Sequence, residues 1–323
     1  MNLAVAHKTM QALDRPGESA RASRLDGGRA SQVYRVQNNN IDVITYVLPA
    51  GTMREAKRRF TVMARVADAF SLAPRPLAIG APIKENDDVL LVVERLDGVP
   101  PSQCGRLDAP TLWRLTENFV SALAKLHAVK IDSAERIPDF LLRTLGEWER
   151  RWNPDEATDA HRDFIALLDW LKCNVPDQSL CALTHNDFKL DNILVDPGDP
   201  ARVLAVVDWE MATIGHPMAD LGIVLSYWIE EGDSLLLRRE APGPTCAPGA
   251  PTRRDLVNLY AVASGREVGN LPYWHTYGLL RLAIVTQNLS LRSGNDERNV
   301  PRSRLIVSTL LQQAMDVCER GRL

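Results

Sequence analysis

A dense cluster of polar residues follows the short apolar run at 180–183. The cluster contains His185, Asn186, Asp187, Lys189, Asp191 and Asn192. Carboxylate and amide oxygens are ligands that Mg²⁺ accepts, because it prefers hard oxygen donors. A carboxylate can also accept or orient the proton of a substrate hydroxyl, and a lysine can stabilise a phosphoryl group during its transfer. These residue types therefore indicate phosphoryl transfer.

The elements that must position this cluster follow it directly. The apolar runs at 193–195 and 203–207 favour two short strands, and 196–200, with two prolines and a glycine, favours a turn between them. A hairpin folds the chain back on itself. We therefore expect Asn192, before the first strand, to lie beside Asp208, after the second.

This arrangement suggests a role for each polar side chain. We expect Asn192 and Asp208 to bind Mg²⁺, with phosphate oxygens among the remaining ligands. Asp187, five positions before Asn192, would act as the base or as the group that orients the hydroxyl. Lys189 would contact the transferred phosphoryl group. An ordinary hairpin with capping Asp and Asn residues is the alternative.

Composition excludes several other classes of function. The chain has 323 residues with 45% hydrophobic and 24% charged residues, which is ordinary for a globular protein. Its formal net charge of −3 gives no reason to expect nucleic acid as a partner. Five cysteines without a CxxC pair argue against a zinc site and a disulfide framework and favour the cytoplasm. We expect no signal peptide and no membrane segment.

The spacing H-x-D-x-x-x-x-N, followed by strand, turn, strand and Asp, resembles the aminoglycoside phosphotransferase and choline kinase superfamily. HNDFKLDNILVD and VVDWEMATIGHPMADLG are especially similar to the kinase-like domains fused to certain acyl-CoA dehydrogenases and to their free-standing bacterial relatives. The resemblance implies an α+β, bilobal protein-kinase-like fold. It implies a nucleotide-binding N-lobe with a small sheet at 1–96, a hinge at 97–103 and a larger, mostly helical C-lobe at 104–323.

In the N-lobe we expect strands at 33–36, 41–48 and 89–93, a helix at 53–70 and an extended connection at 72–79. Taken alone, the two glycines are better explained by a plain hairpin turn, but the resemblance implies that a loop containing Gly27, Gly28 and Ser31 covers the nucleotide. It also implies that the segment from Glu94 to Leu96 binds the adenine edge with its backbone. Glu55 matches the helix glutamate that pairs with a nucleotide-binding lysine, or it complements the helix dipole.

One position departs from the family. The superfamily places Lys or Arg on the strand that we expect at 41–48, whereas this chain has no basic residue from Gln37 through Met53. Depending on the alignment, Thr45, Tyr46 or Pro49 falls at that place. Without the cation, binding of the nucleotide phosphates should weaken. Arg54, Arg35 and Lys189 are the candidate substitutes.

In the C-lobe we expect helices at 109–129, 140–152, 160–174, 252–264, 273–291 and 303–318. His185 and Asp220 are predicted to support the catalytic loop through hydrogen bonds. The family places its acceptor site on the C-terminal helices. Our substrate candidates are therefore Trp228, Tyr273, Trp274, Tyr277 and Arg281, with packing in the core as the alternative for the aromatic residues.

The resemblance implies an ATP-dependent or GTP-dependent kinase that phosphorylates a hydroxyl group of a small molecule. The dehydrogenase-fused relatives suggest a hydroxylated acyl or lipid-like acceptor. An aminoglycoside would need an acidic acceptor face, for which the sequence offers Glu230, Glu231 and Asp233. The alternatives are a nucleotide-binding pseudokinase that acts as a regulatory module, and a kinase related to choline or homoserine kinases.

Overall fold

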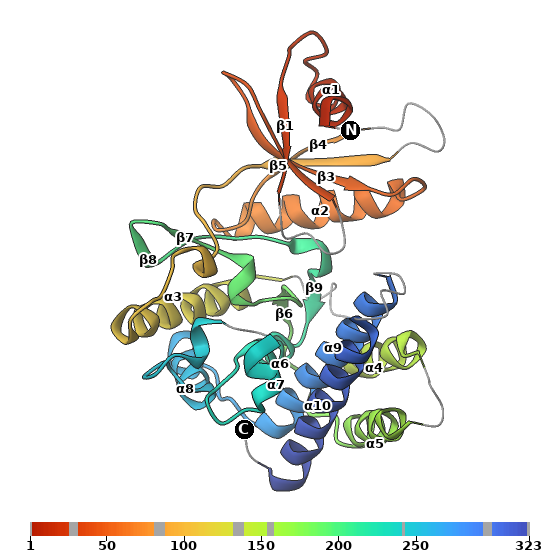
Figure 1. Cartoon of the computed structure of the whole chain (residues 1–323), viewed down its shortest axis with the longest axis vertical. Helices are drawn as coiled ribbons and strands as arrows, with labels where there is room; N and C mark the ends of the chain where they lie inside the picture. The colour runs from red at the N-terminus through yellow and green to blue at the C-terminus, as the bar shows by residue number, and fades with distance from the viewer. Residues whose placement is uncertain are drawn as a thin grey trace. The chain divides into compact units, whose positions relative to one another are not determined.

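The computed structural model describes residues 2–25, 32–80, 88–131, 139–153, 158–240, 243–292 and 299–321. The chain divides into two compact units, which Figure 1 shows from residue 1 in red to residue 323 in blue. The first unit comprises Met1–Gly98 and Leu204–Glu210, and the second comprises Val99–Val203 and Met211–Leu323. Among the described helices, none contains an apolar stretch long enough to cross a membrane.

The first unit is built on an antiparallel sheet with the strand order β1-β2-β3-β5-β4. The central strands β3 and β5 are rich in valine and other residues that favour extended backbone, which explains why they pair. The strands are β1 (Arg21–Arg24), β2 (Gln32–Gln37), β3 (Asp42–Leu48), β4 (Pro76–Gly80) and β5 (Val89–Glu94).

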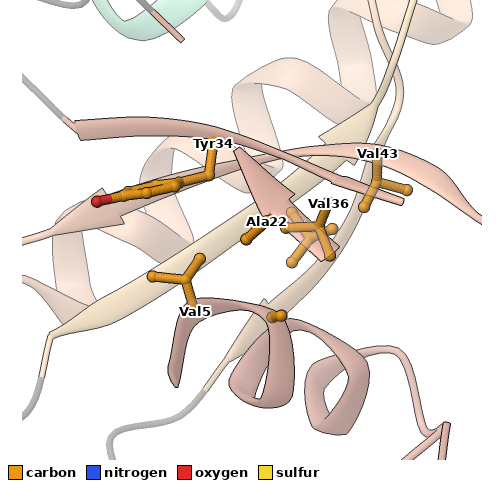
Figure 2. Close-up of a cluster of buried hydrophobic side chains, with 7 residues drawn as sticks. Val5, Ala22, Tyr34, Val36 and Val43 are labelled. Carbon is orange, nitrogen blue, oxygen red and sulfur yellow. The ribbon is translucent and has the colours of Figure 1, made fainter. Parts of the chain in front are cut away.

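Two helices, α1 (Asn2–Ala12) and α2 (Met53–Ala69), cover the sheet of the first unit (Figure 1). Val5 of α1 packs with Tyr34, Val36 and Val43 in a buried hydrophobic cluster, drawn in Figure 2. Side chains alternate between the faces of a strand, so Tyr46, three positions after Val43, points to the opposite face. That face is the one toward α2.

The segment Leu204–Glu210 belongs to the first unit although it lies far along the chain. The backbone N–H of Val206 donates a hydrogen bond to the carbonyl oxygen of Leu72 at 2.8 Å. The Trp209 ring packs edge-on against Phe70, with the ring centroids 5.7 Å apart. These contacts fix Asp208 within the first unit.

Two strands of the sheet were not expected from the sequence. Residues 72–79 were predicted as an extended connection, but part of this segment forms the edge strand β4. Pro76 is the first residue of β4, where a missing N–H costs least. Strand β1, with the sequence RASR, is short and polar and carries no apolar alternation that would have revealed it.

The second unit is mostly helical, and the six predicted helices are confirmed, with no end more than four residues from its predicted position. Thr252 was predicted to be an N-cap, and it forms a capping box with Asp255 at the start of α8. The longer helices are α3 (Ala109–His127), α4 (Phe140–Arg151), α5 (Asp159–Cys173), α6 (Pro217–Tyr227), α8 (Arg253–Ser264), α9 (Leu271–Arg292) and α10 (Asn299–Arg320), with the short α7 (Leu235–Glu240) between α6 and α8.

Short strands hold the loop that contains the polar cluster. Strand β6 (Ala182–Thr184) pairs with β9 (Thr213–Gly215), and β7 (Ile193–Asp196) pairs with β8 (Asp199–Val206). The predicted hairpin is therefore present. Its turn is tighter than the sequence suggested, because β8 already begins at Asp199 and only Pro197 and Gly198 lie between the two strands.

Helices α6 and α9 cross with their backbones in direct contact. A Cβ atom on Gly222 of α6 would overlap the carbonyl group of Trp274, and one on Gly278 of α9 would overlap the carbonyl group of Gly222. Only glycine permits so close an approach. The crossing fixes α9, which carries Arg281, against α6, which carries Asp220.

Candidate active site

Asp187 lies between two cationic side chains in the second unit. Its Oδ2 atom is 2.9 Å from Nζ of Lys189, and its Oδ1 atom is 3.3 Å from Nη2 of Arg281. The Asp187 and Arg281 side chains are only 15% and 10% exposed. The ring of Tyr227 lies below the ammonium of Lys189, with 4.8 Å from Nζ to the ring centroid. The loop therefore presents one carboxylate fixed by two positive charges.

These charges determine the protonation state of Asp187. Burial on its own would raise the pKa of Asp187, but the positive charges of Arg281 and Lys189 outweigh it, and the pKa lies below its usual range. Burial lowers the pKa of Lys189, whereas Tyr227 and Asp187 raise it, and the net pKa is raised. Asp187 is thus an anion, and Lys189 a cation, at neutral pH.

Asp220 accepts two hydrogen bonds from the backbone of the loop. Its Oδ1 atom accepts a hydrogen bond from the backbone N–H of Asn186 at 2.6 Å, and its Oδ2 atom accepts one from the backbone N–H of His185 at 2.7 Å. His127 lies 3.2 Å from Oδ2 through Nε2 and 2.7 Å from the hydroxyl of Tyr260 through Nδ1. The buried contact with His127, which in turn contacts Tyr260, holds the Asp220 carboxylate in place. Asp220, a residue of α6, can therefore fix the position of the loop.

His185 orients the loop through a second hydrogen bond. Its Nδ1 atom accepts a hydrogen bond from the backbone N–H of Asp187 at 3.2 Å. Between them, Asn186 has a positive φ of 60°, a conformation that asparagine adopts more readily than most residues. The side chain of Asn186 donates to Thr184 and to the carbonyl oxygen of Met211, at 3.0 and 3.1 Å. Both residues thus position the loop.

The two predicted metal ligands lie in different units. In the second unit, Nδ2 of Asn192 donates to the backbone oxygen and to Oδ2 of Asp187, at 2.8 and 2.9 Å. Its amide oxygen is therefore the end that suits a cation. In the first unit, Asp208 has a positive φ of 69°. An amide oxygen and a carboxylate are hard-oxygen donors of the kind that Mg²⁺ prefers.

No group of three His, Cys, Asp or Glu side chains among the described residues could hold a metal ion. A cation at either predicted ligand would therefore need further oxygens, from a bound phosphate or from water. This is the coordination that Mg²⁺ adopts with nucleotides. The assignment of these two residues to Mg²⁺ stays a prediction.

Glu55 and Glu94, two of the predicted nucleotide-binding residues, already have partners within the first unit. Glu55, in the first turn of α2, forms ion pairs with Arg58 at 2.8 Å and Arg59 at 2.9 Å. The hydrogen bonds from Arg58 lower the pKa of Glu55 to about 2, against a smaller opposing effect of burial. The N–H of Glu94 donates to the carbonyl oxygen of Arg75 at 2.8 Å, so this N–H is not open to an adenine.

Leu96 follows β5 and is partly buried. Gly27, Gly28 and Ser31 lie outside the described residues, so the predicted phosphate-covering loop remains a prediction.

Of the five substrate candidates, Arg281 is the one that contacts the predicted base. The four aromatic candidates are buried, with at most 3% of each residue exposed, and pack in the core. Trp228 donates a hydrogen bond to the carbonyl oxygen of Pro251 at 2.8 Å, and Trp274 stacks on His216. Of the five candidates, Arg281 is therefore the one that we continue to propose as a residue of the acceptor site.

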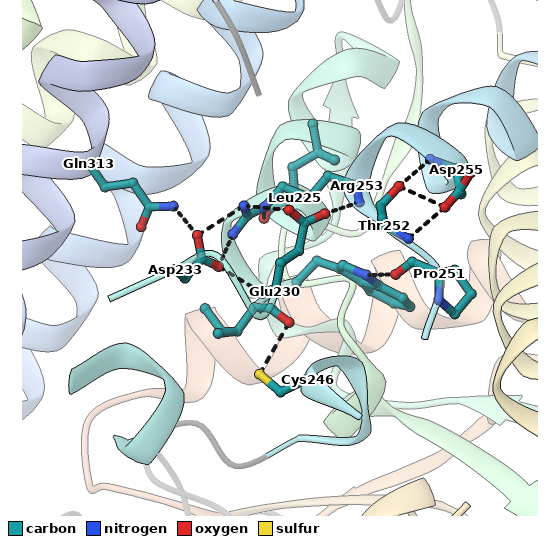
Figure 3. A network of polar contacts seen from close by, with 11 residues as sticks. Leu225, Glu230, Asp233, Cys246, Pro251, Thr252, Arg253, Asp255 and Gln313 are labelled. Carbon is teal, nitrogen blue, oxygen red and sulfur yellow. Dashed lines mark hydrogen bonds and ion pairs between the residues drawn. The ribbon is translucent and has the colours of Figure 1, made fainter. Parts of the chain in front are cut away.

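Two of the three acidic residues considered for an aminoglycoside, Glu230 and Asp233, are already paired within the protein (Figure 3), whereas Glu231 is exposed. The guanidinium of Arg253 forms ion pairs with Asp233 and with Glu230, the latter at 3.4 Å. Gln313 of α10 also donates to Asp233, at 3.0 Å. The Arg253 and Asp233 side chains are only 4% and 8% exposed. The network joins α8 and α10 to the end of α6, so its carboxylates serve the fold.

Sequence reasoning missed three contacts at the site. It did not identify Tyr227 beside Lys189, the His127–Tyr260 pair behind Asp220, or the ion pair between Arg59 and Glu210. Each contact joins residues at least 38 positions apart, and the pattern of neighbouring residues carries no signal for it.

The chain matches the sequence model of a known family and several solved structures. The sequence model of a family described as "Phosphotransferase enzyme family" matches residues 21–255. Among solved structures, a putative aminoglycoside phosphotransferase from Ralstonia eutropha JMP134 covers 96% of this chain and 98% of its own, with 20% identity and a TM-score of 0.73. A thermostable mutant of aminoglycoside phosphotransferase APH(4)-Ia, crystallised with AMP-PNP and hygromycin B, covers 94% and 98%, with 16% identity and a TM-score of 0.60. The fold is thus the kinase-like fold of these enzymes.

The sequence is also similar to two longer proteins. Acyl-CoA dehydrogenase family member 10 of Mus musculus is 24% identical over 288 residues, which are 84% of this chain and 26% of that protein. Acyl-CoA dehydrogenase family member 11 of Gallus gallus is 26% identical over 305 residues, which are 86% of this chain and 37% of that protein. The chain thus spans about a quarter to a third of the length of these relatives.

Proposed function

Because the chain belongs to the phosphotransferase enzyme family, we propose that it transfers the terminal phosphoryl group of ATP to a hydroxyl group of a small molecule. One observation carries this proposal. Asp187 is kept ionised by Arg281 and Lys189 and is held in a loop fixed by Asp220. A carboxylate that is anionic and rigidly placed is suited to accept or orient the proton of an attacking hydroxyl.

The other residues of the loop would serve the transferred group. Lys189 would neutralise charge that develops on the phosphoryl oxygens, since its ammonium is already positioned by Asp187 and Tyr227. Asn192 and Asp208 would hold Mg²⁺, which supplies charge neutralisation on the phosphate oxygens when bound. Related structures contain AMP-PNP or ADP, which supports a nucleotide as the phosphoryl donor. ATP rather than GTP is our choice of donor.

For the acceptor, we propose a hydroxylated acyl compound rather than an aminoglycoside. Glu230 and Asp233, which could have attracted a polycation, are paired with Arg253 (Figure 3). Arg281, the substrate candidate that contacts the proposed base Asp187, is itself a cation. Two relatives carry the name acyl-CoA dehydrogenase, which supports an acyl compound as the acceptor. A positive charge beside the base favours an acceptor with an anionic or neutral group near its hydroxyl.

The decisive test is acceptor-dependent consumption of ATP with Mg²⁺, measured over a panel of hydroxyacyl compounds, amino alcohols and aminoglycosides. Asp187→Asn keeps the size of the base and removes its charge, so turnover should fall about 100- to 10,000-fold. Asp191→Asn, in the same loop but exposed, is the matched control and should retain turnover. Turnover that survives in Asp187→Asn would exclude Asp187 as the base.

A pseudokinase is the second candidate, and the absence of a basic residue on β3 favours it. A pseudokinase would bind Mg²⁺ and ATP, which a shift in melting temperature detects, but no acceptor in the panel would be phosphorylated. A chain that does not bind ATP at all would contradict both candidate functions. Phosphorylation of choline or homoserine alone would instead assign the chain to that branch of the superfamily.

A further inference from the structure

Strand β3 carries no basic residue, so a cation that binds the nucleotide phosphates would have to come from another element of the first unit. Thr45 and Tyr46 are the β3 residues at the relevant position. The hydroxyl of Thr45 lies 3.1 Å from the hydroxyl of Thr9 in α1, so Thr45 points to the α1 face of the sheet. Tyr46, the next residue, points to the α2 face. A cation that takes the place of a basic residue at position 46 should therefore come from α2, the helix that covers the same face of the sheet as Tyr46.

Arg59 of α2 meets this requirement. Its Nε atom donates to Oε1 of Glu55, one helical turn earlier, at 2.9 Å. Its Nη1 atom donates to Oε2 of Glu210 at 2.6 Å. The Arg59 side chain is only 17% exposed. A half-buried guanidinium is thus fixed by two carboxylates, one of them two residues after Asp208.

The charges that act on Tyr46 come from the segment that carries Asp208 and from α2. Burial raises the pKa of Tyr46 most, the negative charges of Asp208 and Glu210 raise it further, and the positive charge of Arg59 lowers it. The direct contact is geometric, because Nη1 of Arg59 lies 2.6 Å from Oε2 of Glu210, two residues after Asp208. Arg59 therefore lies against the segment that carries Asp208.

The other candidate cations are engaged elsewhere or exposed. Arg35 forms a bidentate pair with Asp42 at 2.8 and 2.6 Å, and Lys189 is paired with Asp187. Arg54 is exposed at the start of α2. Arg58 pairs with Glu55 and donates to the backbone oxygen of Glu210 at 2.9 Å, but its side chain is 48% exposed. Among these residues, Arg59 is the one whose guanidinium pairs with the Glu210 carboxylate, two residues after Asp208.

We propose that Arg59 is the phosphate-binding cation of the nucleotide site, supplied by helix α2 in place of a basic residue on β3. This inference rests on the proposed function. A guanidinium has five N–H donors, and the bonds to Glu55 and Glu210 use two of them. The planar fork can then bind phosphate oxygens, while the two carboxylates hold its orientation. Glu55 and Glu210 are thus positioning residues, and Tyr46 fills the space that a strand lysine would otherwise take.

The test is calorimetric binding of Mg²⁺·ATP and of adenosine to the full chain. Arg59→Gln should weaken Mg²⁺·ATP binding about 10- to 100-fold, because charge-assisted hydrogen bonds to phosphate are lost. Adenosine has no phosphate, so its binding should change by less than about two-fold. Lys57→Gln, which removes an exposed cation two residues earlier on the same helix, is the matched control and should bind both ligands like the wild type.

A second variant tests the position of the charge. Arg59→Gln combined with Tyr46→Lys returns a cation to β3 and should recover at least part of the affinity for Mg²⁺·ATP. If Arg59→Gln binds Mg²⁺·ATP as the wild type does, or loses ATP and adenosine affinity equally, the inference is wrong while the proposed function stands. If the wild type binds neither ligand, the proposed function itself fails.

Discussion

Substitution of Asp220 by asparagine tests whether this side chain holds the catalytic loop. The carboxylate accepts hydrogen bonds from two backbone N–H groups, those of His185 and Asn186, at 2.7 and 2.6 Å. Asp220 is fully buried. The amide of Asp220→Asn has the same shape but offers only one oxygen, so its NH₂ group must face one of the two N–H donors.

The size of the effect follows from these contacts. Each hydrogen bond to a charged acceptor contributes about 1.5–3 kcal/mol, and one of the two backbone bonds is lost. The abandoned N–H is buried, and an unpaired buried donor costs about 1–3 kcal/mol. We therefore expect Asp220→Asn to lower the free energy of unfolding of the second unit by about 3–5 kcal/mol.

Urea unfolding followed by tryptophan fluorescence measures this loss well, because all seven tryptophans except Trp209 lie in the second unit. The control is Asp191→Asn, an exposed residue of the same loop, which should change stability by less than about 0.5 kcal/mol. A loss below about 1 kcal/mol for Asp220→Asn would refute the reasoning, because the two backbone hydrogen bonds would then not depend on the charge.

Three further predictions concern other parts of the second unit. Gly222→Ala should destabilise the protein by about 3 kcal/mol or more in urea unfolding, since the added Cβ overlaps the backbone of α9; an unchanged midpoint would contradict the close crossing. Arg281→Gln removes a cation that lowers the pKa of Asp187, so that pKa should rise and the acidic limb of the pH–activity profile should move to higher pH; a shift to lower pH, or none, would show that Arg281 does not set the charge of the base. Thr252→Ala should lower the melting temperature by the equivalent of about 1 kcal/mol through loss of the N-cap of α8, whereas Thr252→Ser should be neutral.

Most helices and strands could be predicted from the sequence because each depends on residues that lie close together along the chain. Thr252 begins α8 because a threonine followed three positions later by an aspartate can satisfy the first N–H groups of a helix. The loop from His185 to Asn192 was predicted because its polar residues lie close together in sequence. Strand β4 was missed because Pro76 breaks the usual strand signal, although an edge strand tolerates a proline at its first position.

The partners of the site residues could not be predicted in the same way. Arg281 is 94 positions from Asp187, and its contact exists only because α9 packs against α6. The acidic patch at Glu230 and Asp233 was considered for an acceptor because the sequence does not show that Arg253 pairs with both residues. Charge pairing across the core is decided by tertiary packing, so a sequence gives the charges without their partners.

The crossing of α6 and α9 has a consequence for how such enzymes diversify. Arg281 lies outside residues 21–255, the part that matches the family, yet it contacts Asp187 within that part. Changes in α9 can therefore alter the charge around Asp187 while the sequence of its loop stays the same. Gly278, one helical turn before Arg281, has no such freedom, because any side chain there would separate the helices. Among relatives that keep this crossing, position 281 should record acceptor choice, and positions 222 and 278 should stay glycine together.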